Sequence, residues 1–129
     1  MFVIDSSAIV DFLIETAGIP RLDDVIRTGG LHAVSFVDLE VMQALRRSVI
    51  GRRLSEEGAV DALAVFGAIR ITRHPHADLL HRIWQLRHNV TAYDAAYIAL
   101  AEKLNLPLVT RDARLARSSG HAARIEHIA

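Results

Sequence analysis

The chain has 129 residues, of which 51% are hydrophobic and 23% charged, as in a folded domain rather than a disordered segment. It contains no cysteine, which excludes disulfide bonds, thiolate nucleophiles and cysteine-ligated zinc. Fifteen basic residues balance fifteen acidic ones, so the molecule has no overall positive field to attract a nucleic acid.

Hydrophobic periodicity predicts strands and helices that alternate along the chain. The predicted strands cover residues 2–4, 31–34, 69–72, 106–109 and 124–128. The predicted helices cover residues 7–15, 20–28, 35–49, 55–68, 77–87 and 91–105, and a short one begins near residue 112. Short apolar strands between amphipathic helices indicate a mostly parallel sheet with helices on both faces. We therefore expect one domain over residues 1–129, an α/β fold built as a three-layer αβα sandwich.

The first ten residues do not resemble a secretory signal, because they include Asp5 and no basic residue. No uncharged apolar run reaches the length that a membrane helix needs. We expect a cytoplasmic protein that does not enter a membrane.

Two predicted strands lead into an acidic residue. Asp5 directly follows the strand at residues 2–4, and Asp112 follows residues 106–109 after Thr110 and Arg111. Ligands of parallel α/β sheets bind at the carboxyl ends of the strands, and neighbouring strands lie about 4.8 Å apart. If these two strands pair, both carboxylates can reach one ion. The alternative is that each aspartate only caps the helix that follows it.

Asp94 is the only charged residue between residues 92 and 101, a helical segment that is small or apolar on almost every side. Such a helix is expected to be buried, where a lone carboxylate is costly unless a cation or several donors compensate it. The alternative is a capping box formed by Thr91 and Asp94, and both interpretations can hold together.

Glu40 is expected to face the interior, because three of the four residues three or four positions away on its helix are apolar. An ion pair with Arg47 is the alternative. Ser35 and Asp38 fit a capping pattern at the start of this helix, so Asp38 is interpreted as part of the cap.

Four carboxylates gathered at one place would repel one another strongly, and a divalent cation would resolve this repulsion. Ligands that are all oxygens suit Mg²⁺ or Mn²⁺ better than zinc or copper. Mg²⁺ orients phosphates and activates water, so the pattern favours metal-assisted hydrolysis of phosphodiesters.

Several motifs, in this order and over nearly the whole chain, resemble the PIN domain, and in particular the VapC-type toxins of bacterial toxin–antitoxin pairs. They are Asp5-Ser6-Ser7-Ala8 after an apolar strand, an inward Glu40, the run from Tyr93-Asp94 to Ala101, and Leu108-Val109-Thr110-Arg111-Asp112.

The resemblance implies a four- or five-stranded parallel sheet and a Mg²⁺- or Mn²⁺-dependent endoribonuclease, homodimeric and held inactive by a cognate antitoxin. It makes Asp5 and Asp94 the principal metal ligands, while Glu40 and Asp112 complete the site and help to hold the attacking water. Ser6 and Thr110 match hydroxyl positions beside the metal rather than ligands.

RNA binding requires positive surface, and outside the four proposed site acids the basic residues exceed the acidic ones by four. Fourteen of the fifteen basic residues are arginine, the residue that binds phosphate through two hydrogen bonds. The candidates lie at the end of one helix and near Asp112: Arg46, Arg47, Arg52, Arg53, Arg111, Arg114 and Arg117. Each of them could instead serve only solubility and the helix dipole.

Other interpretations are weaker. The histidines, including His74 and His76, lack the accompanying ligands of a zinc site and are expected at the surface. Trp84 and Phe66 are expected in the core or an interface. A phosphoacceptor signalling domain would place a lysine after its last central strand, where this chain has Thr110 and Arg111. A PIN-like module that lacks catalytic activity and only binds a partner protein remains open.

Overall fold

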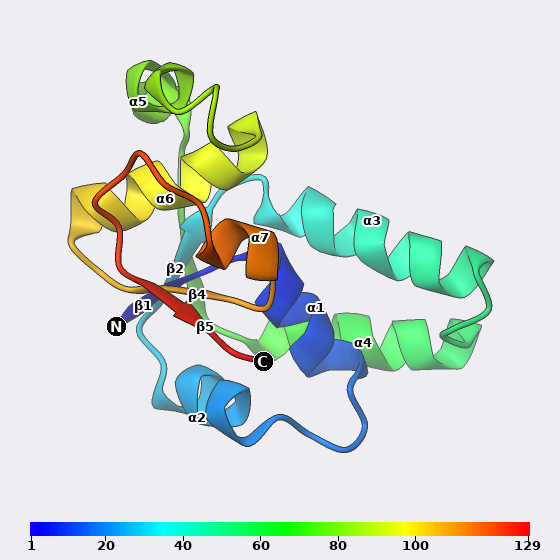
Figure 1. Cartoon of the computed structure of the whole chain (residues 1–129). Coiled ribbons are helices and arrows are strands. Elements are labelled where there is room, and N and C mark those ends of the chain that lie inside the picture. The colour runs from blue at the N-terminus through cyan, green and yellow to red at the C-terminus, as the bar shows by residue number, and fades with distance from the viewer.

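The computed structural model describes all 129 residues and has a five-stranded sheet at its centre, in which every pair of neighbouring strands is parallel (Figure 1). The strands are β1 (Phe2–Ile4), β2 (Leu31–Val34), β3 (Ile71–His74), β4 (Leu108–Thr110) and β5 (Ile125–His127), and their spatial order is β3-β2-β1-β4-β5. The predicted parallel sheet is confirmed, with five strands.

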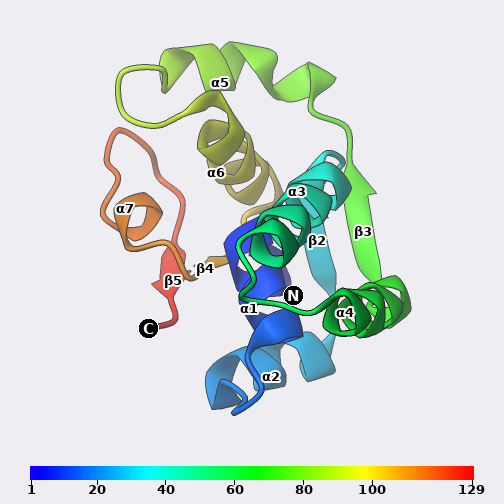
Figure 2. The same ribbon diagram turned by 90° about the vertical axis from the view of Figure 1, so that its right-hand side faces the viewer.

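Seven α-helices and one 3₁₀ turn connect the strands. They are α1 (Ser6–Ile14), α2 (Pro20–Thr28), α3 (Val37–Ile50), α4 (Glu56–Ala68), the turn at Ala77–Leu79, α5 (Leu80–Gln85), α6 (Ala92–Leu104) and α7 (Ala113–Ala116). Helices α1 to α4 gather on one side of the sheet and α6 lies behind it (Figure 2). Right-handed crossovers explain this division, because the chain first moves from β1 towards β3 and then returns towards β5.

The change of direction occurs at β1, in the middle of the sheet. Its two neighbours are β2, reached through α1 and α2, and β4, reached only after α6. Ligands of such sheets bind outside the carboxyl ends of the strands at this switch point. The fold therefore brings the ends of β1 and β4, and whatever follows them, to one place.

The core is packed around β1, β4 and α6. Val3, Ile4, Leu108 and Val109 are fully buried, and every residue from 95 to 101 of α6 is at most 3% exposed. Helix α6 packs against β1 and β2 on one side and against α5 on the other. The prediction that this helix is buried nearly all round is confirmed, and it leaves Asp94 as the only charged residue in the first turn of a buried element.

Three local predictions were wrong. The third strand lies two residues later than predicted, at Ile71–His74. The helix predicted at residues 77–87 is a 3₁₀ turn followed by α5, which ends at Gln85. Ser35 does not cap α3, because the cap residue is Phe36 and it makes no side-chain hydrogen bond. Asp38 instead binds Arg73 through two hydrogen bonds of 2.7 Å.

Two further predictions concern aromatic and histidine side chains. Phe66 is buried, as expected, but Trp84 is 66% exposed and lies outside the core. His74 and His76 do not converge: His74 shares a 2.8 Å hydrogen bond with His32, and the ring of His76 packs near Phe36. None of the helices is long and apolar enough to cross a lipid bilayer.

Candidate active site

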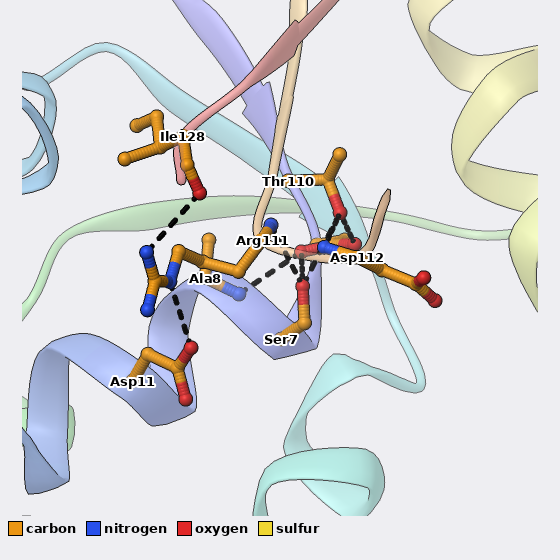
Figure 3. A network of polar contacts seen from close by, with 8 residues as sticks. Ser7, Ala8, Asp11, Thr110, Arg111, Asp112 and Ile128 are labelled. Atoms are coloured by element: carbon orange, nitrogen blue, oxygen red, sulfur yellow. Dashed lines mark hydrogen bonds and ion pairs between the residues drawn. The ribbon is translucent and has the colours of Figure 1, made fainter. Parts of the chain in front are cut away.

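Asp5 lies at the carboxyl end of β1 and begins α1 as its cap residue. Its side chain is only 4% exposed and is held by three donors. Oδ1 accepts hydrogen bonds from Ser7 Oγ at 2.7 Å and from the Ala8 amide at 3.0 Å, and Oδ2 accepts one from Thr110 Oγ1 at 2.5 Å (Figure 3). The predicted cap is therefore present, but it uses only one oxygen of a buried carboxylate.

The electrostatic state of Asp5 is unusual for a capping residue. Burial raises its pKa from 3.8 to about 6, although the hydrogen bonds from Thr110, Ser7 and Ala8 act in the opposite direction, and the charge of Asp94 adds to the rise. Holding this group as a carboxylate in the folded protein therefore costs about 3 kcal/mol. Asp5 forms no ion pair that would offset this cost.

Asp112 is brought to the same region because β1 and β4 pair with Ile4 beside Val109, and the Asp5 amide donates to Val109 O. Thr110 links the two aspartates: its hydroxyl donates to Asp5 and accepts the Asp112 amide at 3.0 Å. Asp112 itself caps α7 by accepting the Arg114 amide at 2.8 Å.

Arg111 and Asp112 point in opposite directions from the end of β4 (Figure 3). Arg111 turns towards α1, where its Nε donates to Asp11 at 2.8 Å and a terminal nitrogen donates to Ile128 O at 3.2 Å. Its backbone amide donates to Ser7 Oγ at 3.1 Å. Arg111 thus connects the end of β4 to α1 and to the residue that follows β5.

Asp94 is the third residue of α6 and is half-buried. Its amide donates to Thr91 Oγ1 at 3.2 Å, so the predicted capping interaction with Thr91 is confirmed. Burial raises the pKa of Asp94, and the neighbouring charge of Asp112 raises it further, whereas Thr91 and Arg114 act in the opposite direction. Asp94 therefore belongs to the cap of α6 and is also a carboxylate whose charged form is disfavoured by its surroundings.

Glu40 extends from α3 into a half-buried position and accepts a 2.7 Å hydrogen bond from the hydroxyl of Tyr97 on α6. Burial raises the pKa of Glu40, hydrogen bonds from Tyr97 and Ser6 lower it, and Asp94 raises it. The alternative of an ion pair with Arg47 is wrong, because Glu40 forms none. The prediction that Glu40 faces inward is confirmed.

Tyr97 is 1% exposed and remains protonated, because burial and the charge of Glu40 both raise its pKa. It and Ser7 are the site residues that the sequence did not single out. The signal for Tyr97 was its position three residues after Asp94, which places both on one face of α6. Ser7 follows Asp5 by two residues in the first turn of α1, where a hydroxyl can reach back to the cap.

Asp94 is the common neighbour of the other three acids: its charge acts on Asp5 and Glu40, and that of Asp112 acts on Asp94. None of the four is ion-paired. The structure contains no group of three acidic or histidine side chains placed closely enough to hold a metal ion. The surplus of negative charge on oxygen donors nevertheless fits a divalent cation, which would offset the burial and repulsion that raise these pKa values.

Two hollows open beside these acids. Glu40 lines a groove of about 630 Å³ with Ser6, the aromatic side chains of Phe36 and Tyr93, and Arg47. Asp94 lines a second, more polar hollow of about 480 Å³ together with Arg87 and Arg114. Glu40 and Asp94 are therefore reached through two hollows of different chemistry, whereas Asp5 and Asp112 line neither of them.

Four of the seven arginines named as RNA-binding candidates show how different their surroundings are. Arg47 lines the groove beside Glu40, and Arg114 lines the hollow beside Asp94. Arg111 is paired with Asp11, and Arg46 lines a separate apolar hollow between α3 and α4. The structure thus places Arg47 beside Glu40 and Arg114 beside Asp94, whereas Arg111 is ion-paired and Arg46 lines neither of these hollows.

Comparison with known proteins identifies relatives of the whole chain. Residues 2–120 match the family model described as the PIN domain. Ribonuclease VapC12 of Mycobacterium tuberculosis is 36% identical over 129 residues, which is the full length of both chains. Ribonuclease VapC1 of the same organism is 41% identical over 126 residues, or 96% of this chain and 95% of that protein.

Solved structures share the fold at lower identity. The structure of VapBC2 from Rickettsia felis, bound to a DNA fragment from its promoter, superposes with a TM-score of 0.70 at 15% identity and covers 98% of this chain and 97% of its own. VapC20 of M. tuberculosis, a toxin that cleaves the sarcin-ricin loop, superposes with a TM-score of 0.62 at 19% identity, covering 95% and 97%.

Proposed function

The chain belongs to the PIN-domain family, among its VapC ribonucleases, and on this premise we propose that it hydrolyses RNA with a divalent metal ion held by four carboxylates, those of Asp5, Glu40, Asp94 and Asp112. The protein is a ribonuclease toxin of a toxin–antitoxin pair. The observation that supports the proposed site most strongly is the buried carboxylate of Asp5, which forms no ion pair and which Thr110 links by hydrogen bonds to the backbone amide of Asp112.

The donor set favours Mg²⁺ or Mn²⁺, because it consists of carboxylate oxygens and includes neither cysteine nor histidine. A cation of this kind, when bound, supplies a lowered pKa for water and neutralises charge on the scissile phosphate. Asp5 and Asp94 are the principal ligands in this proposal, and Glu40 and Asp112 complete the set.

The residues around the acids orient them. Thr110 holds one oxygen of Asp5 while Ser7 and the Ala8 amide hold the other, so the carboxylate cannot rotate freely. Tyr97 fixes Glu40 in the same way from α6. The Thr110 hydroxyl donates to Asp5, and Ser6 lines the groove together with Glu40, so in this proposal both residues stand beside the ligands rather than among them.

Water is the nucleophile in this proposal, and it attacks the phosphorus in line with the departing oxygen without a covalent enzyme intermediate. The chain has no cysteine, and the hydroxyls of Ser7 and Thr110 are committed to Asp5. Glu40 accepts the proton of the attacking water, because burial gives its carboxylate a raised pKa and Tyr97 holds it in place.

The partners of the chain in this proposal are its RNA substrate, a cognate antitoxin and a second copy of itself. The antitoxin covers the groove beside Glu40, whose rim exposes 73% of Leu39 and 60% of Tyr93 to solvent. Occupying this groove would block access to the acids from one side, which accounts for inhibition. Action on cellular RNA agrees with the expected cytoplasmic location.

Incubation of the purified protein with total cellular RNA tests the proposal. Cleavage should require Mg²⁺ or Mn²⁺, stop with EDTA, and be lost in Asp5→Asn and in Asp94→Asn. Asp61→Asn is the matched control, because Asp61 is exposed on α4. Metal-dependent cleavage that survives both site substitutions would contradict the assigned residues. Absence of any cleavage by the wild type with metal would instead favour an interaction module without catalytic activity.

A further inference from the structure

The polar hollow beside Asp94 contains two guanidinium groups, that of the RNA-binding candidate Arg114 and that of Arg87, which the sequence did not single out. Six of its lining residues are polar: Arg87, His88, Asn89, Thr91, Asp94 and Arg114. They come from the segment that leads into α6, from α6 itself and from α7. The hollow thus gives access to the proposed metal ligand Asp94 and shares no lining residue with the aromatic groove.

Neither arginine is neutralised by an acid. Arg87 and Arg114 form no ion pair, although Arg114 is close enough to Asp94 to lower the pKa of that carboxyl. By contrast, Arg82, which lies on α5 just before Arg87, forms an ion pair with Glu102. The hollow therefore holds two guanidinium groups against the single carboxylate of Asp94, an excess of positive charge that suits an anionic ligand.

Arg87 is held in position before any ligand arrives. A terminal nitrogen of its side chain donates to Trp84 O at 2.9 Å, and its guanidinium carbon lies 4.6 Å from the centre of the Trp84 ring. This contact also gives a role to Trp84, which is 66% exposed and packs into no core. A guanidinium ordered in this way loses less conformational entropy when it binds a ligand.

We infer that Arg87 and Arg114 bind a phosphate of the RNA chain adjacent to the scissile one, with Trp84 as a positioning residue for Arg87. The inference rests on the proposed function. A planar guanidinium binds phosphate through two hydrogen bonds. Because the chain has no net charge, attraction of the RNA backbone must come from local groups such as these. The clamp aligns the backbone so that the next phosphate lies over the acids.

The test measures binding of a fluorescent single-stranded RNA of mixed sequence by anisotropy, in EDTA so that no cleavage occurs, over a series of salt concentrations. Arg87→Ala and Arg114→Ala should each reduce the slope of log K against log salt by about 0.7 and weaken binding about fivefold near 0.1 M salt. Arg87→Lys should retain the slope. Arg70→Ala is the matched control, because Arg70 is exposed just before β3, at the opposite edge of the sheet, and should bind as the wild type does.

Trp84→Leu distinguishes positioning from a general loss of structure. It should weaken binding in the wild-type chain but have no further effect in the Arg87→Ala chain. Unchanged slopes in both arginine variants, or a further loss of equal size when Trp84→Leu is added to Arg87→Ala, would overturn the clamp. If the wild type still cleaves RNA in that case, the proposed function stands; failure of the wild type to cleave RNA with metal is the separate result that refutes the function.

Discussion

Replacing Asp5 with asparagine should make the metal-free protein more stable at alkaline pH, although it removes a principal residue of the site. The folded state raises the pKa of Asp5 from 3.8 to about 6, chiefly through burial. Between these two pH values the folded chain binds more protons than the unfolded chain, so the contribution of Asp5 to stability falls as the pH rises. The free-energy cost of ionising Asp5 in the folded state is absent below pH 3.8 and complete above about pH 6.

The magnitude follows from that pKa difference. A carboxyl with these two pKa values costs about 3 kcal/mol as a carboxylate in the folded state. Asparagine carries no charge, and its oxygen can still accept from Ser7 and from the Ala8 amide. Its amide nitrogen faces the Thr110 hydroxyl, which must turn its proton away, and this rearrangement offsets about 1 kcal/mol. A net gain of about 2 kcal/mol corresponds to roughly 5–10 °C in the midpoint of thermal unfolding.

The assay is thermal unfolding of both proteins in EDTA, followed by circular dichroism at pH 4 and pH 8. The difference between Asp5→Asn and the wild type should be small at pH 4 and about 2 kcal/mol in favour of the variant at pH 8. Asp61→Asn, at an exposed position, should show no such change with pH. A variant that is less stable than the wild type at pH 8, or a difference that is the same at both pH values, would refute the assignment of burial as the dominant cause.

Two further substitutions test the groups that hold the acids. Thr110→Val removes the hydroxyl that donates to Asp5 and accepts the Asp112 amide, so it should lower the free energy of unfolding by about 1–3 kcal/mol and abolish most of the RNA cleavage. Thr110→Ser keeps a hydroxyl and should keep both the stability and the cleavage. Equal behaviour of the two variants would contradict this role of Thr110. Tyr97→Phe removes the hydrogen bond that lowers the pKa of Glu40, so the pKa of Glu40 should rise. The pH at which cleavage reaches half its maximum should rise with it. An unchanged pH profile would show that Glu40 is not the group that titrates.

Much of the fold could be predicted because the local signals agree with the tertiary structure. The central strands β1 and β4 are short and mostly apolar runs, and the acids that follow them mark where these strands end. The pairing of β1 with β4 could not be read from the sequence, since it joins segments about a hundred residues apart. That pairing places Thr110 against Asp5, so the most important contact of the site depends on packing of the whole domain rather than on a local motif.

The errors show where local rules are overridden. Ser35 and Asp38 fit a capping pattern, but Asp38 binds Arg73, a residue that β3 brings from 35 positions away. The helix itself has Phe36 as its cap, one residue after Ser35, and this cap makes no side-chain hydrogen bond. Tyr97 has the appearance of an ordinary core aromatic residue in the sequence, because its partner Glu40 lies 57 positions away on α3. The function of such a residue becomes visible only when the two helices are packed together.

Binding of Mn²⁺ to the RNA-free protein, measured by electron paramagnetic resonance, tests the central assignment most directly because it requires no knowledge of the substrate. The wild type should bind Mn²⁺, and Asp94→Asn, which removes the charge of a proposed principal ligand, should bind it at least about tenfold more weakly. Asp61→Asn should bind it as the wild type does. Equal affinity of the wild type and Asp94→Asn for Mn²⁺ would contradict a metal site at these four carboxylates.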